Sequence, residues 1–272
     1  MARSVVYIGI DLLPDRACYV GLGAKGETLF GGQKPFHDPA SWTETIAEIL
    51  AEVPLKSKLV WGIAPSFASG VSRSFFVPAE AQPLSEYVRW ETGLYLGADS
   101  KEFAISWDKL PRTPEGRMVN VVAVRKKEME AFAVSLERVG AEPDLVESRL
   151  FAAANAVEFA QGAAAPKVYS VLVQEGALLR FGFVQNGTMP LQSQTLLRAD
   201  SADERIAEFL GRAPAPSEAF FAQAGDWFDE ERRRSLSDAH GIPVGELPRA
   251  EGVDLQLAVA WAVAHRCKEG AL

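Results

Sequence analysis

Three short strand-like runs, the first two largely apolar, open the chain and predict a meander of antiparallel strands. These runs lie at residues 5–13, 17–23 and 28–36. Turn residues separate them, because Asp15 follows the first run and the pair Lys25-Gly26 follows the second. A helix with one apolar face is then expected over about 39–53, and the apolar run at 58–63 is expected to be a buried strand. The chain therefore begins with three strands, a helix and a further strand.

The same order of elements starts again in the second half of the chain. Strands are predicted at 168–174, 177–185, 188–195 and 218–223, and helices at about 200–210, 226–239 and 255–266. Between the two copies, further strands at about 74–78, 103–110, 118–124 and 143–147 alternate with helices at about 84–95, 126–139 and 149–161. A repeated pattern predicts an internally duplicated α/β chain. Its first half would be residues 1–161, with an insertion at about 66–147, and its reduced second half would be residues 166–272.

Composition and charge narrow the classes of protein that this chain can represent. A length of 272 residues is enough for one large domain or two ordinary ones. The hydrophobic fraction of 48% is an ordinary value for a globular protein. The net charge of −8 argues against a nucleic-acid binder, because a surface that follows phosphates needs a basic face. Cys18 and Cys267 stand alone, so no metal site is expected. No apolar run approaches the ~20 residues of a membrane span, and we expect a cytoplasmic protein that contacts a membrane only through a partner.

Four sequence blocks, in order, resemble the PilM-type proteins of type IV pilus assembly. The blocks are Phe76-Val77-Pro78 with Val88-Arg89-Trp90-Glu91, then 120–126, 136–143 and 148–155. The resemblance covers about residues 5–185, and the remainder fits as a shortened second domain. It implies an actin-like (ribonuclease H-like) fold and a scaffold in a type IV pilus or type II secretion platform, since the cytoplasmic part of GspL is a relative of similar fold.

The same resemblance implies a partner for the protein. It would be the cytoplasmic N-terminal tail of a PilN-like inner-membrane protein, bound between the first subdomain and the insertion. Aromatic residues at Trp90, Tyr95, Phe103 and Trp107 are the candidate contacts. Phe103 and Trp107 lie at alternating positions of one predicted strand. If Trp107 points outward, that strand could accept an extended segment at its edge. A core position is the other interpretation of Trp107.

The resemblance also implies a nucleotide cleft formed by two phosphate-binding hairpins and an adenosine loop, and all three are altered here. The first turn reads Leu-Leu-Pro-Asp-Arg, in which proline lacks an N–H donor and aspartate repels phosphate. In the second hairpin, Gln174 replaces the family's aspartate and Glu175 adds a like charge. The residues that remain of a nucleotide site are Gly9, Asp11, Gly176 and Gly225.

These changes predict a protein that is not an enzyme and has no cofactor. Asp11 is read equally well as an ordinary turn residue at a strand end or as a remnant of a Mg²⁺ site. The alternative function is a nucleotide-binding switch or ATPase of the actin-like superfamily, which would use ATP and Mg²⁺. A third possibility is an unrelated α/β protein that binds a small molecule and acts as a regulator.

Overall fold

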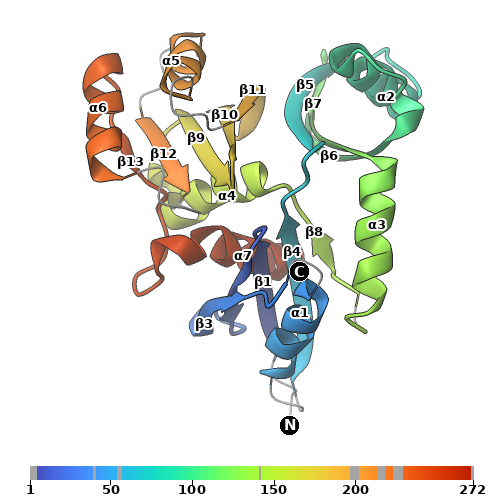
Figure 1. Cartoon of the computed structure of the whole chain (residues 1–272). Coiled ribbons are helices and arrows are strands. Elements are labelled where there is room, and N and C mark those ends of the chain that lie inside the picture. Colours follow the sequence, from blue (N-terminus) through green and yellow to red (C-terminus); the bar gives the residue numbers. More distant parts are fainter. Residues whose placement is uncertain are drawn as a thin grey trace.

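The computed structural model describes residues 5–38, 41–53, 57–140, 142–196, 202–212, 218–222 and 229–270. The described strands form two five-stranded sheets and one three-stranded sheet (Figure 1). Within these ranges, no helix combines the length and the apolar character needed to cross a bilayer.

The first half forms a sheet in the order β3-β2-β1-β4-β8. Its elements are β1 (Val5–Leu12), β2 (Arg16–Leu22), β3 (Thr28–Pro35), α1 (Trp42–Ala51), β4 (Lys58–Pro65) and β8 (Leu145–Val146). β1 pairs antiparallel with β2 and parallel with β4. Ile8 and Ile10 of β1 pack in one core cluster with Ile46 and Ile49 of α1. Central strands that are covered on both faces carry near-continuous apolar runs, as β1 and β4 do.

The second half repeats this topology, with the order β11-β10-β9-β12-β13. Its elements are β9 (Val168–Glu175), β10 (Leu178–Gln185), β11 (Thr188–Leu196), α5 (Ala202–Arg212), β12 (Glu218–Ala222), α6 (Glu230–His240) and β13 (Val244–Glu246). In both sheets the first strand pairs antiparallel with the second and parallel with the fourth. The predicted duplication is therefore confirmed, whereas the short strand β13 was not predicted.

The insertion is a separate small α/β layer between β4 and β8. It contains β5 (Val71–Pro78), α2 (Leu84–Leu96), β6 (Phe103–Thr113), β7 (Gly116–Arg125) and α3 (Lys126–Glu137). Its strands lie in the order β5-β7-β6, so β6 is at an edge. Val88 of α2 is fully buried against Phe75, Val119 and Val121 of the sheet, which holds α2 on one face.

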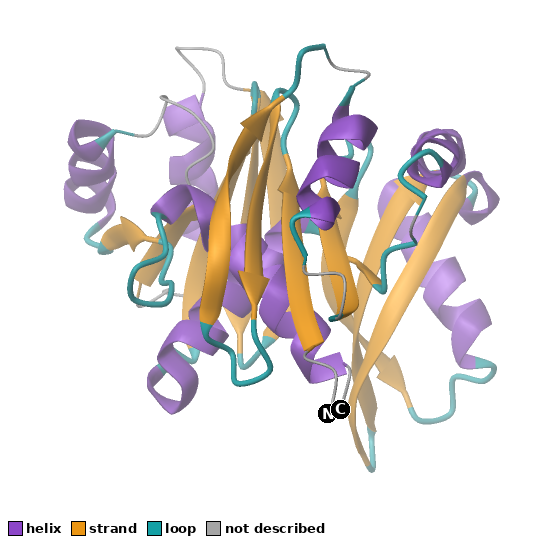
Figure 2. Ribbon diagram, turned by 90° about the horizontal axis from the view of Figure 1, so that it is seen from below, coloured by secondary structure: helices purple, strands orange, loops and turns teal. Residues whose placement is uncertain are grey.

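Two helices rich in alanine, α4 (Arg149–Gln161) and α7 (Ala258–Gly270), pack together in the central core cluster. Figure 2, seen from below, shows helices on both sides of the central strands. Although α7 ends the described chain, it packs on β1, β2 and β4 of the first sheet. Small side chains allow this close packing, and Gly9 is the extreme case. A Cβ added to Gly9 would lie 2.0 Å from the carbonyl oxygen of Ala260.

Candidate functional site

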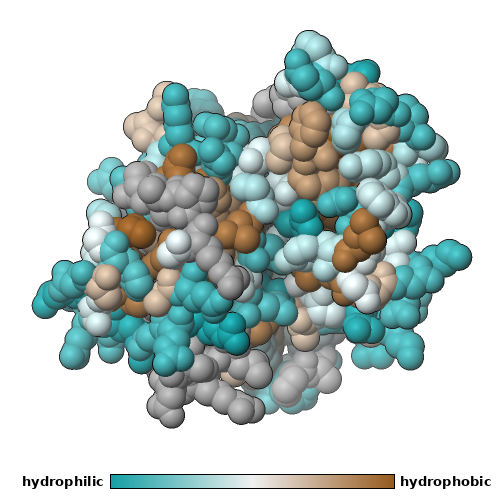
Figure 3. Space-filling model, turned by 90° about the horizontal axis from the view of Figure 1, so that it is seen from above, coloured by the Kyte–Doolittle hydropathy of each residue, from teal (hydrophilic) through white to brown (hydrophobic). Residues whose placement is uncertain are grey.

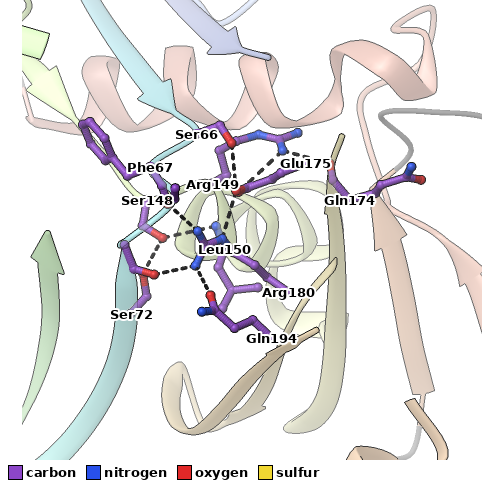
Figure 4. A network of polar contacts seen from close by, with 12 residues as sticks. Ser66, Phe67, Ser72, Ser148, Arg149, Leu150, Gln174, Glu175, Arg180 and Gln194 are labelled. Atoms are coloured by element: carbon purple, nitrogen blue, oxygen red, sulfur yellow. Dashed lines mark hydrogen bonds and ion pairs between the residues drawn. The ribbon is translucent and has the colours of Figure 1, made fainter. Parts of the chain in front are cut away.

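A buried group of charged side chains joins the carboxyl ends of β1 and β9. Asp11 and Glu175 come from these strands, and each side chain is almost fully buried. Arg149, the first residue of α4, contacts both of them, and Figure 4 shows it beside Glu175. Its Nε and Nη2 donate to the two carboxylate oxygens of Asp11 at 2.5 and 3.0 Å. Its Nη1 donates to the carbonyl oxygen of Gln174 at 3.0 Å and lies 3.6 Å from Glu175. Arg149 thus connects the two duplicated halves.

Arg180 of β10 extends this group toward the start of the insertion. Its Nε donates to Oε2 of Glu175 at 2.9 Å, and Nη1 donates to Gln194 at 2.7 Å. The same guanidinium donates to the carbonyl oxygens of Phe67 and Gly70 in the loop after β4. The Ser66 hydroxyl donates to Glu175 at 2.8 Å. We call Asp11, Arg149, Glu175 and Arg180 the cleft network; it connects both halves and the loop that leads into the insertion.

The charges of the cleft network balance, because two arginines face two carboxylates. Burial raises the pKa of Asp11, while Arg149 acts in the opposite direction. Burial also disfavours the charged form of Arg149, but Asp11 and Glu175 more than compensate and raise its pKa. The bidentate geometry requires both oxygens of Asp11 to accept hydrogen bonds, which is the arrangement of an ionised carboxylate. The group is therefore an internally neutralised ion cluster.

The two turns that the sequence identified as altered phosphate hairpins lie against each other. A Cβ added to Gly176 would be 3.6 Å from Cγ of Pro14. Gly176 has a φ of +59°, which a side chain would strain. A phosphate between the turns would need N–H donors or cations that are not already engaged. Here a proline faces a glycine across van der Waals distance, and the neighbouring carboxylates already hold the arginines.

The remnant nucleotide-site residues thus have identifiable structural roles. Gly9 allows α7 to approach β1, Asp11 holds Arg149, and Gly176 forms the turn beside Pro14. Gly225 lies outside the described residues. Sequence reasoning missed Arg149 and Arg180 as members of the site. The sequence does contain one indication for Arg149. It is the first residue of a helix rich in alanine and other apolar residues, where a charged side chain must be either exposed or paired.

A groove separates the insertion from the two halves. It contains two adjoining cavities, of about 270 and 360 Å³. Both are lined by the same five residues, which are Ser106, Val122, Val146, Glu147 and Ser148. The larger cavity extends toward Trp107 and Arg266, and the smaller one reaches Arg149 and Arg180. We call this the insertion groove. Its walls include two edge strands, β6 and β8.

The four predicted partner contacts do not come together in the insertion groove. Trp107 lines the larger cavity and also packs against the core of the insertion. Phe103 is buried, with 5% of its surface exposed. Trp90 and Tyr95 are exposed on α2 but line neither cavity, and Tyr95 accepts a hydrogen bond from Gln192 at 3.2 Å. On the upper surface, apolar residues form separate patches among hydrophilic ones (Figure 3).

Comparison with solved structures gives the fold of the chain. No protein-family model matches the sequence, and a search of curated proteins found no match. The structure of a PilM-PilN type IV pilus biogenesis complex has a similar chain, with a TM-score of 0.74 and 16% identity over 96% of this chain and 98% of that one. The cytoplasmic domain of EpsL, an inner-membrane component of the type II secretion system of Vibrio cholerae, gives a TM-score of 0.57 and 12% identity over 94% of each chain.

A third similar structure is described as having the actin-like ATPase fold. It is a Bacteroides thetaiotaomicron protein of unknown function, with a TM-score of 0.54 and 12% identity over 93% of this chain and 95% of that one. These similarities and the matching strand orders of the two halves confirm the predicted fold class. The chain is an α/β protein with the duplicated actin-like fold and an α/β insertion in its first half, and it resembles PilM and the cytoplasmic domain of EpsL.

Proposed function

We propose that this protein is a non-catalytic scaffold in a type IV pilus or type II secretion assembly platform. It binds the cytoplasmic tail of a PilN-like inner-membrane protein and is held at the inner membrane, on the cytoplasmic side, by that partner. The similarity to the chain in a PilM-PilN complex supports this assignment, as does the similarity to the cytoplasmic domain of EpsL.

The cleft network is the observation that carries the non-catalytic part of the proposal. Actin-like ATPases require a cleft in which phosphate and Mg²⁺ are bound between the halves. Here Arg149 links Asp11 to the end of β9, and Pro14 lies against Gly176. Both oxygens of Asp11 already accept a hydrogen bond from Arg149, and the positive charge of that guanidinium opposes the binding of a metal ion beside them. The protein's own side chains therefore connect the two halves directly.

The insertion groove is the binding site that we propose for the partner tail. An extended peptide can add to the edge of a sheet through its main-chain hydrogen bonds, and side-chain pockets then select its sequence. β6 and β8 are edge strands whose residues line this groove, and its cavities offer space for side chains. Val146 borders both cavities of the groove, and 43% of its surface is exposed.

A co-purification experiment tests the proposal. The tagged protein is expressed with the PilN-like membrane protein of the same organism, and with a version that lacks its cytoplasmic tail. We expect retention of the complete partner and loss of the shortened one. Val146→Arg, which fills the groove, is expected to abolish retention. Val134→Arg makes the same chemical change at an exposed position on α3 and is expected to have no effect. Equal retention by both variants would reject the groove as the binding site.

A further inference from the structure

Glu147 lies at the boundary between the two cavities of the insertion groove, where it lines both of them. Its backbone N–H donates to the carbonyl oxygen of Ile63 at 2.9 Å, which continues the pairing of β8 with β4. The amide of Asn155 donates to Oε1 at 2.9 Å. Oε2 is shielded from solvent and has no hydrogen-bond partner among the described residues. A buried carboxylate oxygen without a donor is costly, so this oxygen is a vacant acceptor.

The charged groups around Glu147 do not satisfy this acceptor. Arg266 of α7 lies in the same cavity, but its Nη2 pairs with Asp108 of β6 at 3.1 Å. Burial raises the pKa of Glu147 to about 7, with Arg266 and Asn155 lowering it and Asp108 raising it. Asp11 and Glu175 of the cleft network each contact an arginine, whereas the hydrogen bond that Glu147 receives comes from a neutral amide.

We propose that Glu147 selects a lysine or arginine side chain in the extended segment that occupies the insertion groove. This inference rests on the proposed function and deepens it. A cationic side chain that enters from either cavity would donate to Oε2 in a charge-assisted hydrogen bond, which is stronger than a neutral one. The net charge of −8 favours the approach of a basic segment. When Glu147 is protonated in the free protein, binding of the cation releases that proton to solvent.

The proposal predicts both a sequence preference and a pH dependence. Random twelve-residue peptides displayed on phage are selected on the wild-type protein and on Glu147→Gln at pH 8. We expect wild-type selections to contain lysine or arginine at one fixed position and Glu147→Gln selections to lack that preference. A selected basic peptide should bind Glu147→Gln at least about tenfold more weakly. Its affinity for the wild type should fall about five- to tenfold between pH 8 and pH 6, while Glu147→Gln should show no such change.

Two controls separate this inference from the proposed function. Glu142→Gln removes the same charge from an exposed position and should bind like the wild type. Val146→Arg should lose every peptide that uses the groove. Peptides that require the open groove but bind Glu147→Gln as tightly as the wild type would overturn the role of Glu147 and leave the proposed function standing. Failure to select any peptide that Val146→Arg rejects would overturn both. Cooperative thermal unfolding of each variant verifies that it is folded.

Discussion

Arg149 shows how one buried side chain can make the two halves of this fold depend on each other. Its guanidinium donates to Asp11 from the first sheet and to the backbone of the second. A buried ion pair adds little net stability compared with apolar residues of the same shape, but removal of one partner leaves an uncompensated charge. Its importance is therefore clearest when the cluster is broken at a single position.

We predict that Arg149→Met lowers the free energy of unfolding by about 3–5 kcal/mol, because Asp11 and Glu175 would remain buried without their shared cation. Denaturant unfolding followed by circular dichroism measures this change. Arg125→Met is the control, since Arg125 forms an exposed pair with Glu102 at 3.6 Å and should lose less than about 1 kcal/mol. Equal losses in the two variants would show that the cleft network does not stabilise the fold.

Glu147 makes the free energy of unfolding of the protein depend on pH. Its pKa is about 7 in the folded protein against an ordinary value of 4.5, so the folded state binds the proton more tightly than the unfolded state. The contribution of Glu147 to stability is complete below pH 4.5 and is lost as pH rises to about 7. Glu147→Gln should therefore be more stable than the wild type at pH 8, by up to about 3 kcal/mol. Urea unfolding at pH 5 and pH 8 tests this; a pH-independent difference between the two proteins would contradict it.

The strands and helices show which features a single sequence can predict. Strand-like runs separated by turn residues identified both three-stranded meanders, and their repetition predicted the duplicated fold that the matching strand orders confirm. β13 was missed because three residues carry too short a pattern. The reason for Gly9 was also missed, because its neighbour in space, Ala260, is far along the chain. Local patterns reveal elements, whereas contacts between distant segments depend on packing that no local pattern encodes.

The contact of α7 with β1 predicts the effect of a single methyl group. Gly9→Ala would place a Cβ 2.0 Å from the carbonyl oxygen of Ala260 and 2.3 Å from the amide nitrogen of Ala264. Both atoms belong to helix backbone, so α7 would have to shift, and we expect a loss of about 1–3 kcal/mol or more. Gly211→Ala is the control, because it lies in α5 with no atom within 4 Å of the added Cβ. The free energy of unfolding of Gly211→Ala should be higher than that of the wild type by about 0.5–1 kcal/mol. Thermal unfolding of both variants distinguishes a packing role for Gly9 from a role in binding nucleotide alone.

At the scale of the whole molecule, one group of buried charged side chains connects parts that lie far apart in the sequence. The cleft network spans both halves and the loop before the insertion, while the insertion groove lies beside it. Glu175 and Arg180 line the smaller cavity of that groove as well as forming the network. A ligand in the groove would therefore contact the same residues that hold the halves together.

This arrangement predicts that Mg-ATP and Mg-ADP leave the stability of the protein almost unchanged. A ligand that binds only the folded state raises the free energy of unfolding by RT ln(1 + [L]/Kd). If Kd is weaker than about 1 mM, 1 mM nucleotide contributes less than about 0.4 kcal/mol, and calorimetric titration should give no saturable heat. A gain of about 4 kcal/mol at 1 mM would instead correspond to micromolar binding. The nucleotide-switch alternative would then replace the scaffold, because the Pro14 turn and the Arg149 cluster would have to open to admit phosphate.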